Sequence, residues 1–211
     1  MIRLLVVRHG ESTWNAQSRW QGQADPALSP LGERQAEEAA ERLADVASVA
    51  AVWTSDLVRA RRTAELIASR LGVESVQPEP RLRERDVGSW SGLTREEIEA
   101  RWPGYLAARR APPDFEGDAE LLARTTAGLA AAVDGSASGD VLVVTHGGVV
   151  RTIERSLGAT PDRLPNLAGR WLLAASPGEL TLGERVVLVE PEDVTVPGEE
   201  SEQDPVAREK T

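Results

Sequence analysis

The apolar positions of this chain fall into short continuous runs separated by longer amphipathic stretches. Runs such as "LLVV" and "VLVV" are typical of strands buried on both faces, as in a parallel sheet. The pattern predicts strands over residues 2–7, 49–55, 73–77 and 140–145. Two late strands, over residues 171–176 and 184–190, are predicted to pair through the turn region between them.

The stretches between the strands carry the spacing and the caps of α-helices. Ser29 and Pro30 occupy the N-cap and first helical positions of one helix, and Gly72 is placed to end another. Thr94 and Glu97 have the spacing of a capping box. The predicted helices span residues 31–45, 56–72, 93–104, 118–135 and 149–158.

Strands that alternate with helices favour the α/β class. We expect a three-layer α/β/α sandwich whose central sheet is mostly parallel and covered on both faces. This domain is predicted over residues 1–190. Residues 191–211 are rich in acidic residues, proline and glycine and have no periodicity, which predicts a disordered acidic tail.

Composition and charge exclude several classes of function. The chain has 211 residues, 41% of them hydrophobic, and a formal net charge of −10, so it offers no obvious basic face for nucleic acid. No apolar run is long enough to span a bilayer, and no signal-peptide cleavage site follows the first strand. It has no cysteine, which excludes disulfides and thiolate metal sites. We expect a cytoplasmic protein without nucleic-acid or membrane partners, and a homodimer is compatible with the sequence.

The only two histidines of the chain stand in equivalent places. His9 follows the first strand and precedes Gly10, and His146 follows the strand over residues 140–145 and precedes Gly147. Ligands of open α/β sheets bind beyond the carboxyl ends of the strands, so both histidines are expected at the ligand crevice. The glycine after His9 is interpreted as giving a ligand access to the backbone.

Arginines supply positive charge near the predicted crevice. Arg8 adjoins the first histidine, and Arg59 lies in the first turn of the helix over residues 56–72, near its positive end. Two histidines, two arginines and a helix N-terminus would suit a phosphate dianion. Cleavage of a phosphate ester also needs a proton donor for the leaving oxygen. The residues alone leave three candidates for this donor: Glu79, Glu84 and Asp86.

Four motifs in sequence order resemble the histidine phosphatase superfamily, which includes phosphoglycerate mutases and related phosphatases. They are "RHGES" with Asn15, "SDLVRARRTAELIA", "LRERDVGSWSGLT" and "THGG". The resemblance covers roughly residues 2–150, with weaker matching to about residue 189. It implies a phosphoglycerate mutase-like fold and a small phosphorylated metabolite as substrate.

The resemblance also implies roles for individual residues. His9 corresponds to the nucleophile that becomes a phosphohistidine, and Glu84 to the acid that protonates the leaving group. No metal and no other cofactor are implied. The residues that correspond to phosphate-binding or substrate-binding positions are Arg8, Asn15, Gln21, Gly22, Arg59, His146 and Gly147.

Phosphatase activity is the preferred reading, and two alternatives stay open. A mutase needs more positive charge to hold a bisphosphorylated intermediate. Arg109 and Arg110 could correspond to the arginine pair of family mutases, but the lysine that accompanies that pair is missing, because the sole lysine is Lys210. Substrate contact and simple solvation are equally compatible with this pair. The other alternative is a non-catalytic phosphate-binding scaffold, which the presence of all the expected site residues disfavours. The sequence also leaves open whether Trp14, Trp20 or Trp90 lines the pocket.

Overall fold

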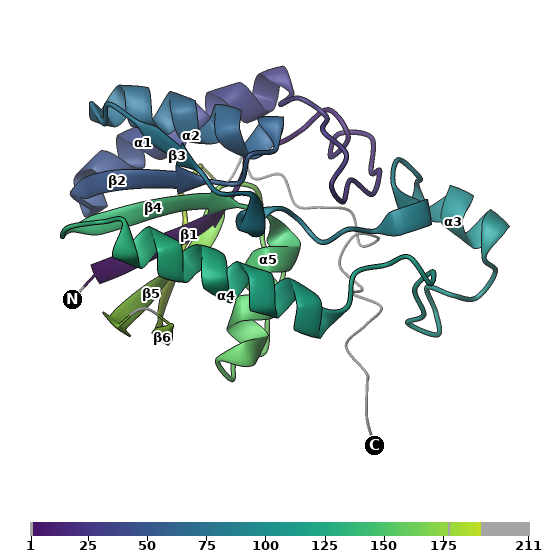
Figure 1. The fold of residues 1–211 in the computed structure, drawn as a ribbon. Helices are drawn as coiled ribbons and strands as arrows, with labels where there is room; N and C mark the ends of the chain where they lie inside the picture. The colour runs from purple at the N-terminus through teal and green to yellow at the C-terminus, as the bar shows by residue number, and fades with distance from the viewer. Residues whose placement is uncertain (1, 177, 191–211) are drawn as a thin grey trace.

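A computed structural model describes residues 2–176 and 178–190 and shows one mixed sheet between two layers of helices (Figure 1). The strand order is β3-β2-β4-β1-β5-β6. Strands β1 to β4 run parallel to one another, β5 pairs antiparallel with β1, and β6 pairs antiparallel with β5. The predicted three-layer sandwich is therefore confirmed. The strands are β1 Ile2–Arg8, β2 Val49–Thr54, β3 Val76–Pro78, β4 Asp140–Thr145, β5 Ala168–Ser176 and β6 Glu179–Val187.

Each face of the sheet has its own hydrophobic core, because alternate strand residues point to opposite sides. Leu5 and Val7 of β1 pack with helices α1 (Pro30–Val46) and α2 (Val58–Leu71). Leu4 and Val6 pack with helices α4 (Asp118–Asp134) and α5 (Gly147–Ser156) on the other face. All four side chains are buried, which explains why residues 4–7 of β1 are apolar without interruption. The helices are α1 Pro30–Val46, α2 Val58–Leu71, α3 Arg95–Arg101, α4 Asp118–Asp134 and α5 Gly147–Ser156.

The predicted helix caps are present. Ser29 Oγ accepts a hydrogen bond from the Gly32 N–H at 3.0 Å at the start of α1. Gly72 ends α2 with a φ of +70°, a left-handed conformation that glycine adopts without steric cost. Thr94 and Glu97 form the capping box of α3. Local sequence signals therefore fix where these helices begin and end.

Several element boundaries differ from the prediction. Strand β3 begins at Val76, three residues later than predicted, and β5 begins at Ala168, three residues earlier. Strand β6 begins at Glu179, well before residue 184, because Leu180 and Leu182 alternate onto the face that packs against the core. Helix α5 begins at Gly147, two residues before the predicted start at residue 149. Glycine has a poor helix propensity, which hid this first turn from sequence reasoning. The predicted tail over residues 191–211 lies outside the described residues.

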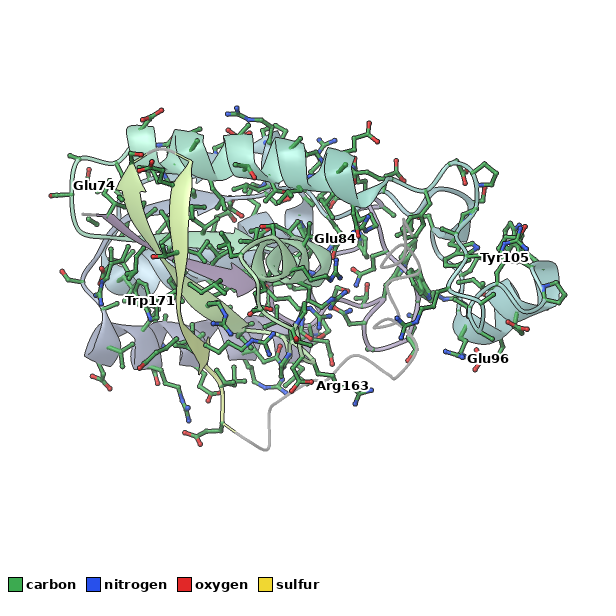
Figure 2. All side chains as sticks on the ribbon, turned by 90° about the horizontal axis from the view of Figure 1, so that it is seen from below. Glu74, Glu84, Glu96, Tyr105, Arg163 and Trp171 are labelled. Atoms are coloured by element: carbon green, nitrogen blue, oxygen red, sulfur yellow. The ribbon has the colours of Figure 1, made fainter. Side chains whose placement is uncertain are left out.

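A smaller apolar cluster stands beside the sandwich. It contains Trp90 and Ile98, and the polypeptide around α3 projects from the helical layers (Figure 1). Figure 2 shows Glu96 and Tyr105 on this projection and Glu84 on the neighbouring side of the sandwich. The chain between β3 and α4 thus connects the projection to the carboxyl ends of the strands. In residues 2–176 and 178–190, no helix combines the length and apolar character needed to cross a membrane.

Candidate active site

The two histidines meet because their strands are neighbours. Strands β1 and β4 pair in parallel with Arg8 opposite Thr145, so the next residue of each chain segment is a histidine. The His9 N–H donates to the Thr145 carbonyl at 2.9 Å, and the rings of His9 and His146 lie 5.1 Å apart, edge to face. The sheet therefore brings together two residues that are far apart in the sequence.

Hydrogen bonds fix the tautomer of His9. Its Nδ1 lies 2.6 Å from the carbonyl oxygen of Gly10, which can only accept, so Nδ1 carries the hydrogen. The other ring nitrogen, Nε2, then carries a lone pair and accepts a hydrogen bond from Arg59 Nε at 3.1 Å. A neutral imidazole in this tautomer has its basic lone pair on Nε2, the nitrogen beside Arg59.

Gly10 is needed for packing and not for ligand access. A Cβ atom at this position would lie 2.5 Å from the carbonyl oxygen of Gly32 in α1, and Gly10 is not among the described residues that line the pocket. The interpretation that Gly10 gives a ligand access to the backbone was therefore wrong. The glycine allows the loop after β1 to approach the first turn of α1.

Arg59 is completely buried, in contrast to the exposed Arg61 and Arg62 on the same helix. Its guanidinium donates to the carbonyls of Gly22 at 2.8 Å and Ala24 at 2.7 Å. Burial lowers the pKa of Arg59 to about 10, which leaves it protonated at neutral pH. Arg8 donates to the Leu164 carbonyl at 2.8 Å. Backbone carbonyl oxygens therefore orient both guanidinium groups beside the pocket, where they could contact an anionic ligand.

His146 is fully buried beside His9. Its Nε2 lies 2.9 Å from Ser55 Oγ, and its Nδ1 has no hydrogen-bond partner within residues 2–176 and 178–190. It is not one of the described residues that line the pocket, although Gly147 is. An unpaired buried ring nitrogen costs free energy, and a ligand atom could satisfy it.

Glu84 is held at the N-terminus of α5. Its carboxylate accepts from the Arg85 N–H at 2.8 Å and from the Gly148 N–H at 3.0 Å. A side chain at Gly148 would collide with the Glu84 carboxylate. Glu79 instead pairs with Arg81 at 2.6 Å, and Asp86 accepts from the Gly88 N–H. Among the three candidate acids, the fold places Glu84 at the pocket.

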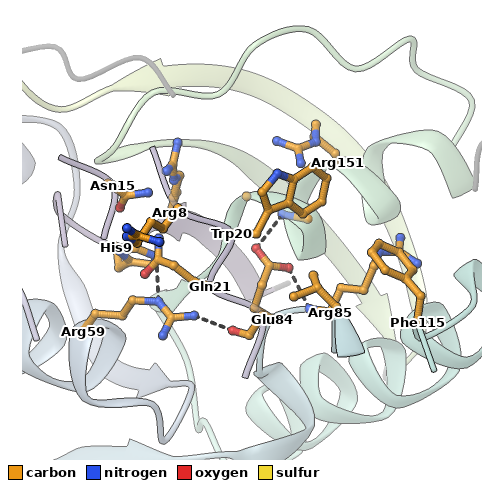
Figure 3. Close-up of a pocket in the computed structure, with 15 residues that line it drawn as sticks. Arg8, His9, Asn15, Trp20, Gln21, Arg59, Glu84, Arg85, Phe115 and Arg151 are labelled. Atoms are coloured by element: carbon orange, nitrogen blue, oxygen red, sulfur yellow. Dashed lines mark hydrogen bonds between the residues drawn. The ribbon is translucent and has the colours of Figure 1, made fainter. Parts of the chain in front are cut away.

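The pocket encloses about 670 Å³, including space open to solvent, and Figure 3 shows Glu84 across it from His9. Among the described residues, Glu84 is the only carboxylate that lines it. Asn15 is held by Ser12, whose N–H and hydroxyl lie 3.1 Å from its Oδ1. The predicted residues that line the pocket are Arg8, His9, Asn15, Gln21, Gly22, Arg59, Glu84 and Gly147.

Other predicted contacts lie elsewhere. Arg109 and Arg110 are exposed and do not line this pocket, and the Arg110 guanidinium stacks on Tyr105 at 4.3 Å. Trp20 is a wall of the pocket, whereas Trp14 and Trp90 are not. Within the described ranges, no three histidine, aspartate or glutamate side chains are grouped so that they could hold a metal ion.

Sequence reasoning missed several pocket residues. Arg19, Arg85 and Arg151 also line the cavity, but on sequence alone each resembles an ordinary surface arginine. Only Arg151 had a usable signal, because it follows Gly147 by four residues and so lies on the same face of α5. The remaining missed residues that line the cavity are Val87, Phe115 and Gly148.

Burial disfavours the protonated form of both histidines in the folded protein. Burial, followed by the charges of Arg59 and Arg8, lowers the pKa of His9 well below its ordinary value. Burial, with Arg59 as the strongest neighbouring charge, likewise lowers the pKa of His146. A neutral imidazole is the nucleophilic form of histidine, and the lowered pKa keeps His9 in that form at neutral pH.

Acid is expected to destabilise the protein from about pH 6.5 downward. Below that pH both histidines become protonated in the unfolded chain but not in the folded protein. The free energy of unfolding therefore decreases as the pH is lowered. The expected slope is up to about 1.4 kcal/mol per pH unit for each histidine. Carboxylates with lowered pKa values, such as Asp56 and Glu154, act only at lower pH.

Urea denaturation at about pH 7.5 and about pH 5.5 measures this effect. His146→Gln should remove about half of the slope. A free energy of unfolding that is the same at both pH values would contradict the prediction.

The geometry defines an α/β protein whose pocket lies at the carboxyl ends of parallel strands and is lined by arginines, a histidine and one carboxylate. The model of the histidine phosphatase superfamily (branch 1) matches residues 4–173, and the chain belongs to this family. The recognition from sequence motifs is thereby confirmed.

Named relatives agree with this membership. The chain is 38% identical over 157 residues to phosphoglycerate mutase-like protein 4 of Arabidopsis thaliana, covering 71% of this chain and 68% of the relative. It is 40% identical over 160 residues to a metal-independent phosphoserine phosphatase of the same organism, covering 72% and 67%. A mycobacterial glucosyl-3-phosphoglycerate phosphatase, solved with VO3, superimposes with a TM-score of 0.73 at 33% identity, covering 86% of this chain and 96% of that one.

Proposed function

We propose that this protein is a phosphomonoesterase that hydrolyses a small phosphorylated metabolite through a phosphohistidine on His9. The observation that carries the proposal is the state of His9, a pocket residue whose lowered pKa favours the neutral ring and whose Nε2 contacts Arg59. The family and the phosphatases among the relatives support the same chemistry.

The first half-reaction transfers the phosphoryl group to His9. Nε2 attacks phosphorus, the bond from phosphorus to the ester oxygen breaks, and that oxygen takes a proton from the Glu84 carboxylic acid. Arg8 and Arg59 neutralise the charge on the non-bridging phosphoryl oxygens, and the unpaired Nδ1 of His146 is a further partner. The alcohol product leaves with the proton.

The second half-reaction returns the enzyme to its starting state. Glu84, now a carboxylate, takes a proton from water, and the resulting hydroxide attacks phosphorus as the bond to Nε2 breaks. Inorganic phosphate leaves, and Glu84 is again a carboxylic acid. Every proton donated in the first step is recovered in the second.

A mutase would return the phosphoryl group to another oxygen of the bound product. That reaction needs a strong grip on a bisphosphorylated intermediate, and the exposed pair Arg109 and Arg110 does not line the pocket. Hydrolysis is therefore the better supported of the two reactions.

Release of p-nitrophenol from its phosphate ester, with EDTA present, tests the proposal. We expect sustained turnover with one inorganic phosphate per phenol, and an acid-labile phosphoenzyme on rapid quenching. Interconversion of phosphoglycerates without net phosphate release would favour the mutase. No turnover of any aryl or alkyl phosphate would contradict both reactions and favour the scaffold.

Arg124 is a positioning residue for the proposed acid. From α4 it donates to the Glu84 carbonyl at 2.9 Å and to the Arg83 carbonyl at 2.6 Å, and its Nε pairs with Glu116 at 2.6 Å. One guanidinium thus ties the Glu84 loop to a helix. Its removal should let Glu84 drift from the pocket without altering His9.

Arg124→Met is expected to lower kcat for alkyl phosphates by about 10–100-fold, because small displacements of a proton donor are costly. Aryl phosphates, whose leaving groups need little protonation, should lose much less. Arg70→Met, which removes an exposed pair with Glu41, is the matched control and should change neither rate. Equal losses for alkyl and aryl esters would show that Arg124 acts on overall stability alone.

A further inference from the structure

Arg151 differs from the other arginines of the pocket in having no partner in the protein. Within the described ranges it makes no hydrogen bond or ion pair, and its Nε is buried and unsatisfied. Arg19 pairs with Glu97 at 3.0 Å, and Arg85 pairs with Asp118 at 2.5 Å. A buried guanidinium hydrogen without an acceptor is uncommon and calls for a ligand or another explanation.

The position of Arg151 places its charge beside the phosphate site. Its Nη1 lies 3.2 Å from the point where a Cβ atom on Gly147 would stand, and the Arg8 Cδ lies 3.6 Å from the same point. Gly148, the next residue, donates to Glu84. The Arg151 guanidinium therefore reaches the first turn of α5, where the side chains of Arg8 and Glu84 also converge.

Figure 3 shows Arg151 on the Glu84 side of the pocket, with His9 and Arg59 on the other side. In the proposed reaction Glu84 protonates the leaving oxygen, so the alcohol portion of the substrate lies on this side. Arg151 thus borders the part of the substrate that distinguishes one phosphate ester from another.

We propose that Arg151 is a specificity-determining residue that binds a carboxylate on the alcohol portion of the substrate. The inference rests on the proposed phosphatase function and assigns a substrate class to it. Within the described ranges no carboxylate pairs with the Arg151 guanidinium, so it is available for one further negative charge on the substrate. Its planar fork suits the two oxygens of a carboxylate.

A matched pair of substrates tests this role. 3-Phosphoglycerate and glycerol 3-phosphate differ only in a carboxylate that is replaced by a hydroxymethyl group. We expect the wild-type protein to prefer 3-phosphoglycerate. Arg151→Met, which keeps the length of the side chain but removes the charge, should lower kcat/KM for 3-phosphoglycerate by about 10–100-fold, mainly through KM. Glycerol 3-phosphate and p-nitrophenyl phosphate should change by less than about threefold.

Arg155→Met is the control on the same helix. Arg155 lies one turn further along α5, pairs with Asp118 at 3.6 Å and does not line the pocket. This variant should leave the ratio of the two substrates unchanged. Arg151→Lys should retain part of the preference, because it keeps the charge and loses the fork.

The outcomes separate this inference from the proposed function. Equal losses on both substrates in Arg151→Met, or no preference in the wild type, would overturn the role of Arg151 while hydrolysis stands. Selective loss on 1,3-propanediol bisphosphate, with 3-phosphoglycerate unaffected, would assign a second phosphate and overturn the carboxylate. If no phosphate ester is hydrolysed, the proposed phosphatase function is wrong. Calorimetric binding of both ligands to His9→Ala, with and without Arg151→Met, then decides the role of Arg151 by itself.

Discussion

His9→Ala is expected to lower kcat/KM for p-nitrophenyl phosphate by about four to six orders of magnitude. The substitution removes Nε2, the atom that forms the covalent bond in the proposed reaction. Among the described residues that line the pocket, the only other possible nucleophile is the Glu84 carboxylate, which the proposal assigns to proton transfer. Binding of the phosphate by Arg8 and Arg59 should persist, so inorganic phosphate should still bind. Steady-state rates and acid-quenched phosphoenzyme measure the two aspects separately.

Two controls distinguish the loss of the nucleophile from a folding defect in the variant. The ring of His9 is buried and accepts from Arg59, so the thermal unfolding midpoint of the variant must be compared with that of the wild type. In His9→Gly, added imidazole should restore part of the turnover by occupying the vacated space. A His9→Ala protein that hydrolyses at near the wild-type rate would exclude the phosphohistidine mechanism.

Glu84→Gln is expected to slow alkyl phosphates by about 10²–10⁴-fold and p-nitrophenyl phosphate far less. An alkoxide is a poor leaving group unless it is protonated, whereas nitrophenolate leaves readily without a proton. The amide can still accept one of the two N–H groups that hold the carboxylate, from Arg85 and Gly148, so the loop should stay near its place. Rates across a series of esters with different leaving-group pKa values give the measurement.

Glu79→Gln is the matched control for this experiment. Glu79 lies in the same connection, pairs with Arg81 and does not line the pocket. Its substitution should leave the dependence on the leaving group unchanged. If Glu84→Gln slows alkyl and aryl esters by the same factor, Glu84 is not the proton donor.

The sequence by itself determined the parts of this protein that have local causes. Apolar runs predicted the strands, and the caps at Ser29, Gly72 and Thr94 predicted helix ends, because each signal acts within a few residues. The strand-end positions of His9 and His146 follow from the same patterns. Where two signals conflicted locally, as in the glycine-rich first turn of α5, the predicted boundary was displaced.

Tertiary structure alone decided how those parts meet. The sequence could not choose among Glu79, Glu84 and Asp86, because the choice depends on an N–H group of α5 that lies 64 residues away from Glu84. The burial of Arg59 likewise depends on the carbonyls of Gly22 and Ala24 in a distant loop. Such contacts are set by which surfaces the sheet and helices bury, and no short window of sequence contains that information.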